Sequence, residues 1–440
     1  MANCVNEYLT IPSSFDFKEI KKAISKHLPD RKILNFTTSN LDEGNFQTNV
    51  LTVDSNIEIP DIFKFSQRQY ENEEQFNACF IIPTGIGCEI GGHAGDATPA
   101  LRLIANQCDQ VVTHPNVVNA SDINEIPKNA LYVEGYHLNN FLMGNIGLMK
   151  KRKNRILAVI EENDKEKLFE NLAINSVNGA RATLGIDVEI LKINLKMKME
   201  AFFQGGQAKG KISNIENLFA ALEGVQEDFD TIAISSIIHM EDDKIHETYS
   251  KSEGNMVNPW GGVESMLTHL ISARFNKIAA HAPMLDRKEI LGLDVGIVDP
   301  RIAPEIISMS YFYSVLKGLH KAPQIVSKNN GLSIEDISAL IIPEGVFGIA
   351  VLAALHQGVK VIAVKNENKM TNDLSKLPWK KNQFFPCDNY LEAAGLLSCL
   401  REGIEHTSIR RPINPLDFLK QKKDPMVKDN YLESMPSHLH

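Results

Sequence analysis

Residues 85–95 bring together the residue types that a binding or catalytic loop uses. The segment holds five glycines, a thiol, a carboxylate and an imidazole, and it follows an apolar run at 80–82. Glycine reaches positive φ angles and lets a ligand come close to the backbone. A tight strand-to-helix connection is the structural alternative. The glycines that we expect to bind a ligand are Gly85, Gly87, Gly91 and Gly92.

Two cofactor motifs can be compared with this loop. A dinucleotide fingerprint, G-x-G-x-x-G, would need glycine where Ile90 stands, and a phosphate-binding P-loop would need lysine where His93 stands. The chain therefore lacks a nicotinamide or nucleoside triphosphate fingerprint. What remains is a glycine-rich nest of backbone amides that could hold a carboxylate, a phosphate or a developing oxyanion.

Imidazole and carboxylate groups near the loop suggest acid-base or metal chemistry. His93 and His114 are candidate catalytic residues, because imidazole exchanges protons near neutral pH. The same histidines with Asp96 form a candidate site for a divalent metal, although their spacing matches no dedicated metal motif. Asp96 could instead cap the helix that follows. Cys88 is either a nucleophile or a small core residue. The cofactor, if one is used, stays open.

Polar side chains also follow several apolar runs that we expect to be strands. Asn116 comes after the run at 111–113 and is a candidate ligand-binding residue. Glu134 comes after the run at 130–133 and is a candidate catalytic partner of the histidines. In open parallel sheets, ligands bind beyond the carboxyl ends of the strands, where the loops converge. We therefore expect these groups to share one cleft with the glycine loop. Helix caps and turns are the alternative use for such residues.

Two later segments have the composition of ligand-binding turns. Residues 255–264 offer Asn258, an indole, two glycines and Glu264 just before an expected helix. We predict that Asn258 binds the ligand and that Glu264 is a catalytic partner of the histidines; an Asn-Pro turn with a packed tryptophan is the alternative. Residues 298–305 place Arg301 at a helix start, where it could clamp an anion or pair with Glu305.

The order of apolar segments predicts an α/β fold. From about residue 76, short apolar runs alternate with amphipathic stretches, and several runs are continuously apolar, as in strands buried on both faces. We expect largely parallel sheets covered by helices. The expected organisation is a small α+β segment at 1–75, an α/β core at 76–406 with one or two lobes, and a polar tail at 407–440.

One short pattern occurs twice. Ile-Ile-Pro-x-Gly is found at 81–85 and again at 341–345, each time followed by a loop or helix and another apolar strand. A duplicated α/β half would produce this pattern.

The composition and net charge of the chain exclude some classes of binding partner. The chain has 440 residues and a net charge of -9, so nucleic acid and anionic membranes are not expected partners. No secretory signal is recognisable at the start, and the longest apolar stretch is broken by Pro343 and Glu344. The six cysteines show no disulfide framework. We expect a cytoplasmic protein, without a membrane span, that binds a small molecule and is compatible with homo-oligomers.

The sequence blocks at 83–87, 91–97 and 113–116 resemble an uncharacterised family catalogued as a domain of unknown function. The blocks at 258–264, 281–284 and 299–301 look like later parts of the same family. The resemblance covers most of residues 80–400. It implies membership of that family and carries no activity, cofactor or catalytic role with it.

These observations favour an enzyme acting on a small, polar, anionic metabolite by acid-base or metal-assisted chemistry. Hydrolysis, elimination or isomerisation fits better than hydride transfer, because the nicotinamide fingerprint is missing. The alternative is a non-catalytic ligand sensor or partner-binding protein that uses the same cleft. Turnover distinguishes the two, since ligand binding is common to both.

Overall fold

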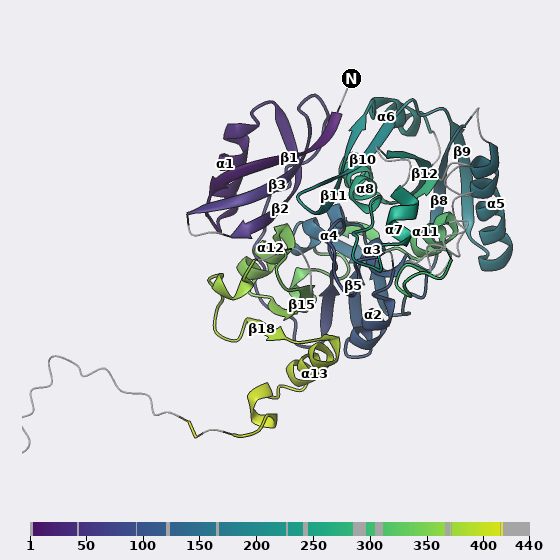
Figure 1. Cartoon of the computed structure of the whole chain (residues 1–440). Helices are drawn as coiled ribbons and strands as arrows, with labels where there is room; N and C mark the ends of the chain where they lie inside the picture. Colours follow the sequence, from purple (N-terminus) through teal and green to yellow (C-terminus); the bar gives the residue numbers. More distant parts are fainter. Residues whose placement is uncertain are drawn as a thin grey trace, which may run out of the picture.

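The structure is a computed structural model. It describes the residue ranges 3–41, 44–93, 95–119, 124–163, 167–225, 228–240, 245–284, 296–303, 311–365, 370, 372–413 and 415–416. Within these ranges the strands form one sheet of ten strands, one of six and one of two. Figure 1 shows the six-stranded sheet, marked by β5, β15 and β18, below the two ends of the larger sheet.

The six-stranded sheet is entirely parallel. Its strands are β4 (Asn77–Phe80), β5 (Gln110–Thr113), β6 (Ala130–Tyr132), β15 (Ile337–Pro343), β17 (Lys360–Val364) and β18 (Phe384–Cys387). They lie in the order β18-β17-β15-β4-β5-β6. The chain therefore starts at a central strand, moves outward to β6, returns beside its starting point at β15 and moves outward the other way. This is the order of a doubly wound sheet, with its switch point between β4 and β15.

The repeated Ile-Ile-Pro-x-Gly pattern lies at this switch point. One copy follows β4 and the other ends β15, and the two strands pair in parallel with Ile341 opposite Phe80. Every residue of β15 is buried, which fits its largely apolar sequence. Both loops therefore leave the sheet at the same edge, side by side.

Helices connect and cover these strands. The helices of this part are α2 (Thr98–Ala105), α3 (Pro115–Val118), α4 (Gly135–Leu142), α12 (Ile349–Gln357) and α13 (Tyr390–Arg401). Helix α12 begins directly after the loop that follows β15 and packs on α4, while α13 packs on α2. The amino-terminal ends of α4 and α12 thus lie at the same edge of the sheet as the two loops.

The ten-stranded sheet is mixed, and this corrects the expectation of largely parallel sheets. Its strands are β1 (Asn3–Pro12), β2 (Arg31–Leu41), β3 (Asn45–Asp54), β8 (Arg155–Glu161), β9 (Asp187–Ile193), β10 (Lys198–Gln204), β11 (Gln207–Ser213), β12 (Thr231–Met240), β13 (Ile278–Met284) and β16 (Phe347–Gly348). The pairs among β8, β9, β12 and β13 are parallel, as is the pair of β10 with β12. The strands from β16 to β10 pair antiparallel.

Hairpins are the physical reason for the antiparallel half. Strands β10 and β11 are joined by Gly205 and Gly206, both with positive φ, which is the backbone of a tight hairpin turn. Strand β1 then pairs with β11, so the N-terminal strands continue the same sheet. The apolar runs at 111–113 and 130–133 are strands β5 and β6, as expected, whereas β1, β10 and β11 were not predicted.

Helix α8 (Gly261–Phe275) lies at the centre of the molecule. It packs against β11, β13 and α4, and most of its residues are buried. The remaining described elements are α1 (Phe17–His27), α5 (Lys167–Leu184), α6 (Glu216–Glu223), α7 (Ile245–Ser250), α11 (Tyr311–His320), β7 (Ile146–Met149), β14 (Gln324–Ser327) and three short 3₁₀ turns, Ile334–Asp336, Leu374–Lys376 and His406–Ile409.

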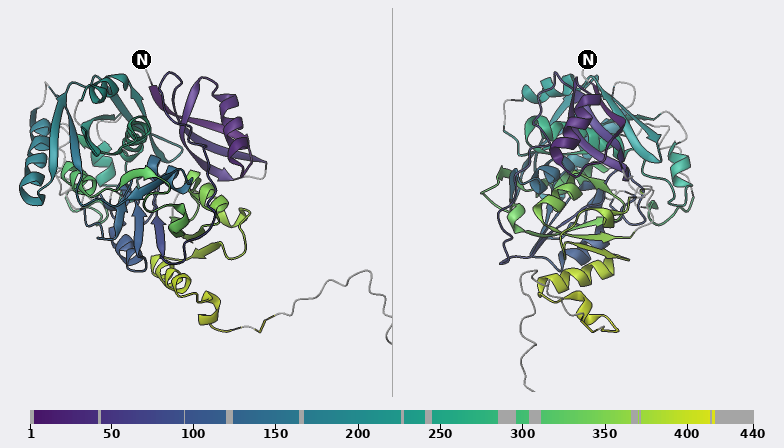
Figure 2. Two further views of the ribbon diagram at one scale, coloured as in Figure 1. Left: turned by 180° about the vertical axis from the view of Figure 1, so that it is seen from behind. Right: turned by 90° about the vertical axis from the view of Figure 1, so that its left-hand side faces the viewer.

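The outer helices α1 and α5 flank the large sheet, and the described C-terminal residues are exposed. Figure 2 shows from behind that α1 covers the outer side of the antiparallel strands, and α5 lies on the opposite flank beside β9. None of the helices that the structure describes is long and apolar enough to cross a membrane. Of the tail predicted at 407–440, the described residues 407–413 and 415–416 are exposed, and the others lie outside the described residues.

Candidate functional site

A cavity of about 260 Å³ lies at the switch point of the doubly wound sheet. The loops after β4 and β15 form part of its wall, together with the first turns of α4, α8 and α12. Strand β13 and residues 35–37 of β2 close other sides. Its position beyond the carboxyl ends of β4 and β15 is where doubly wound sheets bind ligands.

Most of the residues singled out from the sequence line this cavity. Those that do are Gly85, Gly91, Gly92, His114, Asn116, Glu134, Asn258 and Glu264. Four others, Gly87, His93, Asp96 and Arg301, are absent from its lining. The structure therefore brings His114, Glu134 and Glu264 together around one space but leaves His93 outside it.

The glycine loop is shaped by close packing. A Cβ atom on Gly85, which has φ of +78°, would lie 2.7 Å from the carbonyl oxygen of Ala208 in β11. One on Gly91 would lie 2.4 Å from the Ile82 side chain, and one on Gly92 would lie 2.1 Å from the Cys88 carbonyl oxygen. Such distances are far below van der Waals contact. These glycines are thus required for the loop to fold against its neighbours. This is the use expected of a tight strand-to-helix connection.

The two asparagines predicted to bind a ligand, Asn116 and Asn258, form hydrogen bonds that stabilise the walls of the cavity. The side-chain amide of Asn116 donates to the carbonyl oxygen of Ile82 at 3.0 Å and ties α3 to the end of β4. The Oδ1 atom of Asn258 accepts from the amides of Trp260 and Gly261 at 3.0 and 3.1 Å. Asn258 therefore satisfies orphan amides where α8 begins.

Glu134 caps helix α4. Its carboxylate accepts from the amides of Tyr136 and His137 at 2.6 and 2.8 Å, and from Nδ1 of His137 at 2.6 Å. Burial alone would raise the pKa of Glu134, but the charge and hydrogen bonds of His137 outweigh it and lower the pKa. The Glu134 side chain is thus an ionised, fully hydrogen-bonded carboxylate at the edge of the cavity.

His114 is buried at the end of β5. Its Nε2 atom accepts a hydrogen bond from the amide of Ile82 at 3.1 Å, so a neutral ring carries its proton on Nδ1. Burial, together with the nearby His269, lowers the pKa of His114 to about 4. At neutral pH this side chain is therefore an uncharged imidazole that can donate from Nδ1.

His269, on the central helix α8, has the opposite arrangement. Its Nδ1 atom donates to the carbonyl oxygen of Ser265 at 2.7 Å, which leaves the lone pair on Nε2. The side chain is 7% exposed, lines the cavity, and its Nε2 atom has no hydrogen-bond partner. Burial lowers the pKa of His269. The result is a neutral imidazole with a free acceptor.

Glu264 and His281 form a hydrogen-bonded chain with Ser236. Nδ1 of His281 lies 2.9 Å from Oε1 of Glu264, and Nε2 lies 2.9 Å from Oγ of Ser236. Glu264 and His281 line the cavity, whereas Ser236 is fully buried in β12 and is not part of the lining. The chain orients a carboxylate at the cavity wall, but its serine is not placed to attack a ligand.

His93 and Asp96 lie behind the glycine loop. Nδ1 of His93 lies 2.6 Å from the hydroxyl of Tyr249, whose ring packs edge-on against Trp260. Burial and the charge of Arg301 lower the pKa of His93, and burial raises the pKa of Asp96 to about 7. Burial also raises the pKa of Cys88 to about 12, which removes the thiolate that a nucleophile needs.

Within the residues that the structure describes, no group of three or more His, Cys, Asp or Glu side chains is arranged to hold a metal ion. The two histidines have different hydrogen-bond partners, since Nε2 of His114 accepts from the Ile82 amide while Nδ1 of His93 lies against the Tyr249 hydroxyl. The metal-ligating arrangement of His93, Asp96 and His114 is therefore not supported.

Arg301 pairs with carboxylates away from the cavity. Its Nη1 atom lies 2.8 Å from Oε2 of Glu89, and its Nε atom lies 3.0 Å from Oδ1 of Asp299. Its Nη2 atom donates to the carbonyl oxygen of Glu253 at 3.1 Å. The described lining of the cavity contains no lysine or arginine. A ligand anion would therefore have to be met by backbone amides or imidazoles.

His269 was not selected from the sequence; it lies on the helix that was expected to follow residues 255–264. A signal was present, since Glu264, Ser265, Thr268 and His269 recur with helical spacing. All four line the cavity. His281 opens the block at 281–284 noted in the sequence, but it was not selected as a site residue.

Fold and cavity together define an α/β protein with a doubly wound parallel sheet, whose ligand-sized cavity is lined by imidazoles and carboxylates. Residues 77–410 match the model of the family described as "Protein of unknown function (DUF3326)", and the chain belongs to this family. The resemblance noted in the sequence is thereby confirmed. The chain is also similar to an uncharacterized lipoprotein of Synechococcus sp., with 31% identity over 356 residues, or 77% of this chain and 94% of that protein.

Proposed function

We propose that this protein is an enzyme that acts on a small, polar metabolite by acid-base chemistry in the cavity at the switch point. The observation that carries the proposal is the Nε2 atom of His269, which is buried at the cavity without a protein partner. A buried polar atom without a partner is costly, and enzymes retain such atoms where a substrate will provide the partner.

His269 is the proton acceptor in this proposal. The carbonyl oxygen of Ser265 fixes the tautomer, and the lowered pKa keeps Nε2 free at neutral pH. His114 is the complementary hydrogen-bond donor. It donates from Nδ1, because its Nε2 atom already accepts from the Ile82 amide. His114 and His269 lie close enough for the charge of one to affect the pKa of the other. An acceptor and a donor near one another suit elimination, isomerisation or hydrolysis.

Glu264 orients the substrate in this proposal. Its carboxylate is held by His281 and is partly exposed at the cavity wall. A carboxylate in this position accepts hydrogen bonds from hydroxyl or amino groups of a ligand. The cavity can therefore bind a substrate through one of its donors while a proton is moved elsewhere on the molecule.

The test compares His269→Gln with His27→Gln. His27 is an exposed histidine whose Nδ1 lies 2.9 Å from the carbonyl oxygen four residues earlier, so it reproduces the local bond of His269 outside the cavity. Wild-type protein is incubated with a metabolite library, and mass spectrometry identifies a compound that it converts. We expect His269→Gln to lower kcat on that compound by about 10²- to 10⁴-fold and His27→Gln to leave it unchanged.

The pH profile provides a second readout. Because the pKa of His269 is lowered, kcat/KM should rise as His269 loses its proton and reach its plateau below the usual titration range of histidine. Turnover by His269→Gln at the wild-type rate would contradict the proposal. Saturable binding of a metabolite that is never converted would favour the non-catalytic sensor.

A further inference from the structure

The first turn of α12 forms an open wall of the cavity. Gly348, Ile349, Ala350 and Val351 all line it. The first amides of a helix have no carbonyl partner inside the helix, and no side chain caps α12. Two other helices that start at the cavity differ from α12, because Glu134 caps α4 and Asn258 satisfies the amides where α8 begins.

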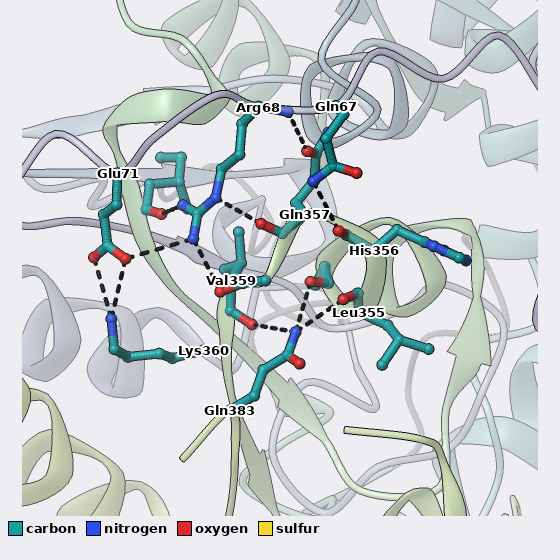
Figure 3. A network of polar contacts seen from close by, with 12 residues as sticks. Gln67, Arg68, Glu71, Leu355, His356, Gln357, Val359, Lys360 and Gln383 are labelled. Carbon is teal, nitrogen blue, oxygen red and sulfur yellow. Dashed lines mark hydrogen bonds and ion pairs between the residues drawn. The ribbon is translucent and has the colours of Figure 1, made fainter. Parts of the chain in front are cut away.

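The opposite end of α12 is fixed by a buried cation. Arg68 donates from Nε to the carbonyl oxygen of Gln357 at 2.6 Å and from Nη2 to that of Gly358 at 2.9 Å. The side-chain amide of Gln383 donates to the carbonyl oxygens of Ala354 and Leu355, both at 3.0 Å (Figure 3). These bonds satisfy the carbonyl oxygens at the carboxyl end of the helix and fix the position of that end. The amino end, with its partial positive charge, is the end left open.

An independent observation indicates that this cavity is built for a ligand. The Nε2 atom of His269, in a side chain that is 7% exposed, has no partner and belongs to the same lining as the first turn of α12. Strand β2 connects the two positions. Thr37 pairs with Gly348, and residues 35–37 also line a smaller adjoining recess together with His269.

We propose that the N-terminus of α12 binds an anionic group of the substrate, a carboxylate or a phosphate, in the cavity where His269 accepts a proton. This inference rests on the proposed function and names the class of its substrate. Aligned amides at a helix start favour anions. The absence of lysine and arginine from the described lining leaves that task to the backbone. The two carboxylates of the lining do not oppose it strongly, since each is hydrogen-bonded to an imidazole.

The test uses Ala350→Asp and Ala350→Asn. Ala350 lies in the first turn of α12 and is half-buried at the cavity. Aspartate there places a carboxylate on the free amides, whereas asparagine has nearly the same shape and no charge. Aspartate is also favourable near a helix start, so the variant should fold. Inorganic phosphate and acetate are titrated by calorimetry, with chloride holding the ionic strength constant.

We expect saturable binding of at least one of the two anions by wild type, retention of affinity within about threefold in Ala350→Asn, and at least a tenfold loss in Ala350→Asp. No saturable binding by wild type, or equal affinity in both variants, would overturn the inference.

The variant His269→Gln separates this inference from the proposed function. Phosphate or acetate binding should persist in it while turnover is lost. If it keeps full turnover and Ala350→Asp still loses anion binding, the catalytic proposal fails and the anion site stands. If turnover depends on His269 but neither anion binds in wild type, the anion site fails alone.

Discussion

At the residue scale, two buried imidazoles line one cavity and use opposite ring nitrogens for their backbone hydrogen bonds. The Ile82 amide holds His114 with its proton on Nδ1, and the Ser265 carbonyl holds His269 with its lone pair on Nε2. Each arrangement comes from one backbone hydrogen bond. A donor and an acceptor are thus prepared without a change in the charge of either ring.

The lowered pKa of His114 predicts a pH-dependent stability. Its folded pKa is about 4, below the ordinary value of 6.5, so between these values the unfolded chain takes up a proton that the folded chain refuses. Stability contributed by this group is therefore complete above about pH 6.5 and is lost as the pH falls toward 4. The loss should be about 2 to 3 kcal/mol at pH 4.5.

Urea unfolding of wild type and His114→Gln at pH 7 and pH 4.5 measures this loss. Other groups titrate in the same range, but they are common to both proteins. The stability difference between the two proteins should therefore shrink by about 2 to 3 kcal/mol from pH 7 to pH 4.5. An equal pH dependence in both proteins would show that His114 is not held neutral.

The candidate site could be predicted in part from residue types at strand ends. His114, Glu134 and Asn116 follow parallel strands of one sheet, so topology alone brings them to one edge. His93 and Arg301 could not be excluded in the same way. Their positions depend on how the glycine loop turns behind Tyr249 and on ion pairs with Glu89 and Asp299, which no local pattern specifies.

At the element scale, α8 reaches its position through close backbone contact with β11. A Cβ atom on Gly262 would lie 2.3 Å from the carbonyl oxygen of Ala208, and Gly85 meets the same oxygen from the loop. Both glycines are thus part of one junction between the helix, the loop and the strand. This junction sets where Glu264 and His269 lie, because both are on α8.

Replacement of Gly262 by alanine should therefore destabilise the protein. The added methyl group would meet backbone, which cannot rotate away, and overpacking of this kind costs about 1 to 3 kcal/mol or more. The matched control is Gly179→Ala in α5, where nothing lies within 4 Å of the new Cβ atom. That change should stabilise by about 0.5 to 1 kcal/mol. Urea unfolding would refute the close contact if both changes shifted stability in the same direction.

Elements were predicted best where the sequence pattern was long or repeated. The two Ile-Ile-Pro-x-Gly segments lie beside each other at the carboxyl ends of adjacent strands at the switch point. In the antiparallel half of the large sheet, β1, β10 and β11 were not predicted. Strands β10 and β11 have lysine, glutamate and glutamine interspersed among their apolar residues, so neither forms a continuous apolar run.

At the scale of the whole molecule, parts that are distant in sequence complete one cavity. The family region begins at residue 77, yet residues 35–37 of β2 line the cavity from the N-terminal strands. The parallel half of the large sheet is inserted between β6 and β15, and it contributes β13 with His281. The division at residue 75 stays a prediction, but the cavity depends on residues from both sides of it.

The most direct test of this account is a comparison of the small molecules that the protein retains from cell extract. Wild type and Ala350→Trp, a change that fills the cavity from the first turn of α12, are dialysed against the same extract, and mass spectrometry identifies what each retains. The account predicts that wild type enriches a small compound with a carboxylate or phosphate group and that Ala350→Trp, shown by circular dichroism to be folded, does not. Retention of the same compounds by both proteins, or of none by wild type, would contradict it.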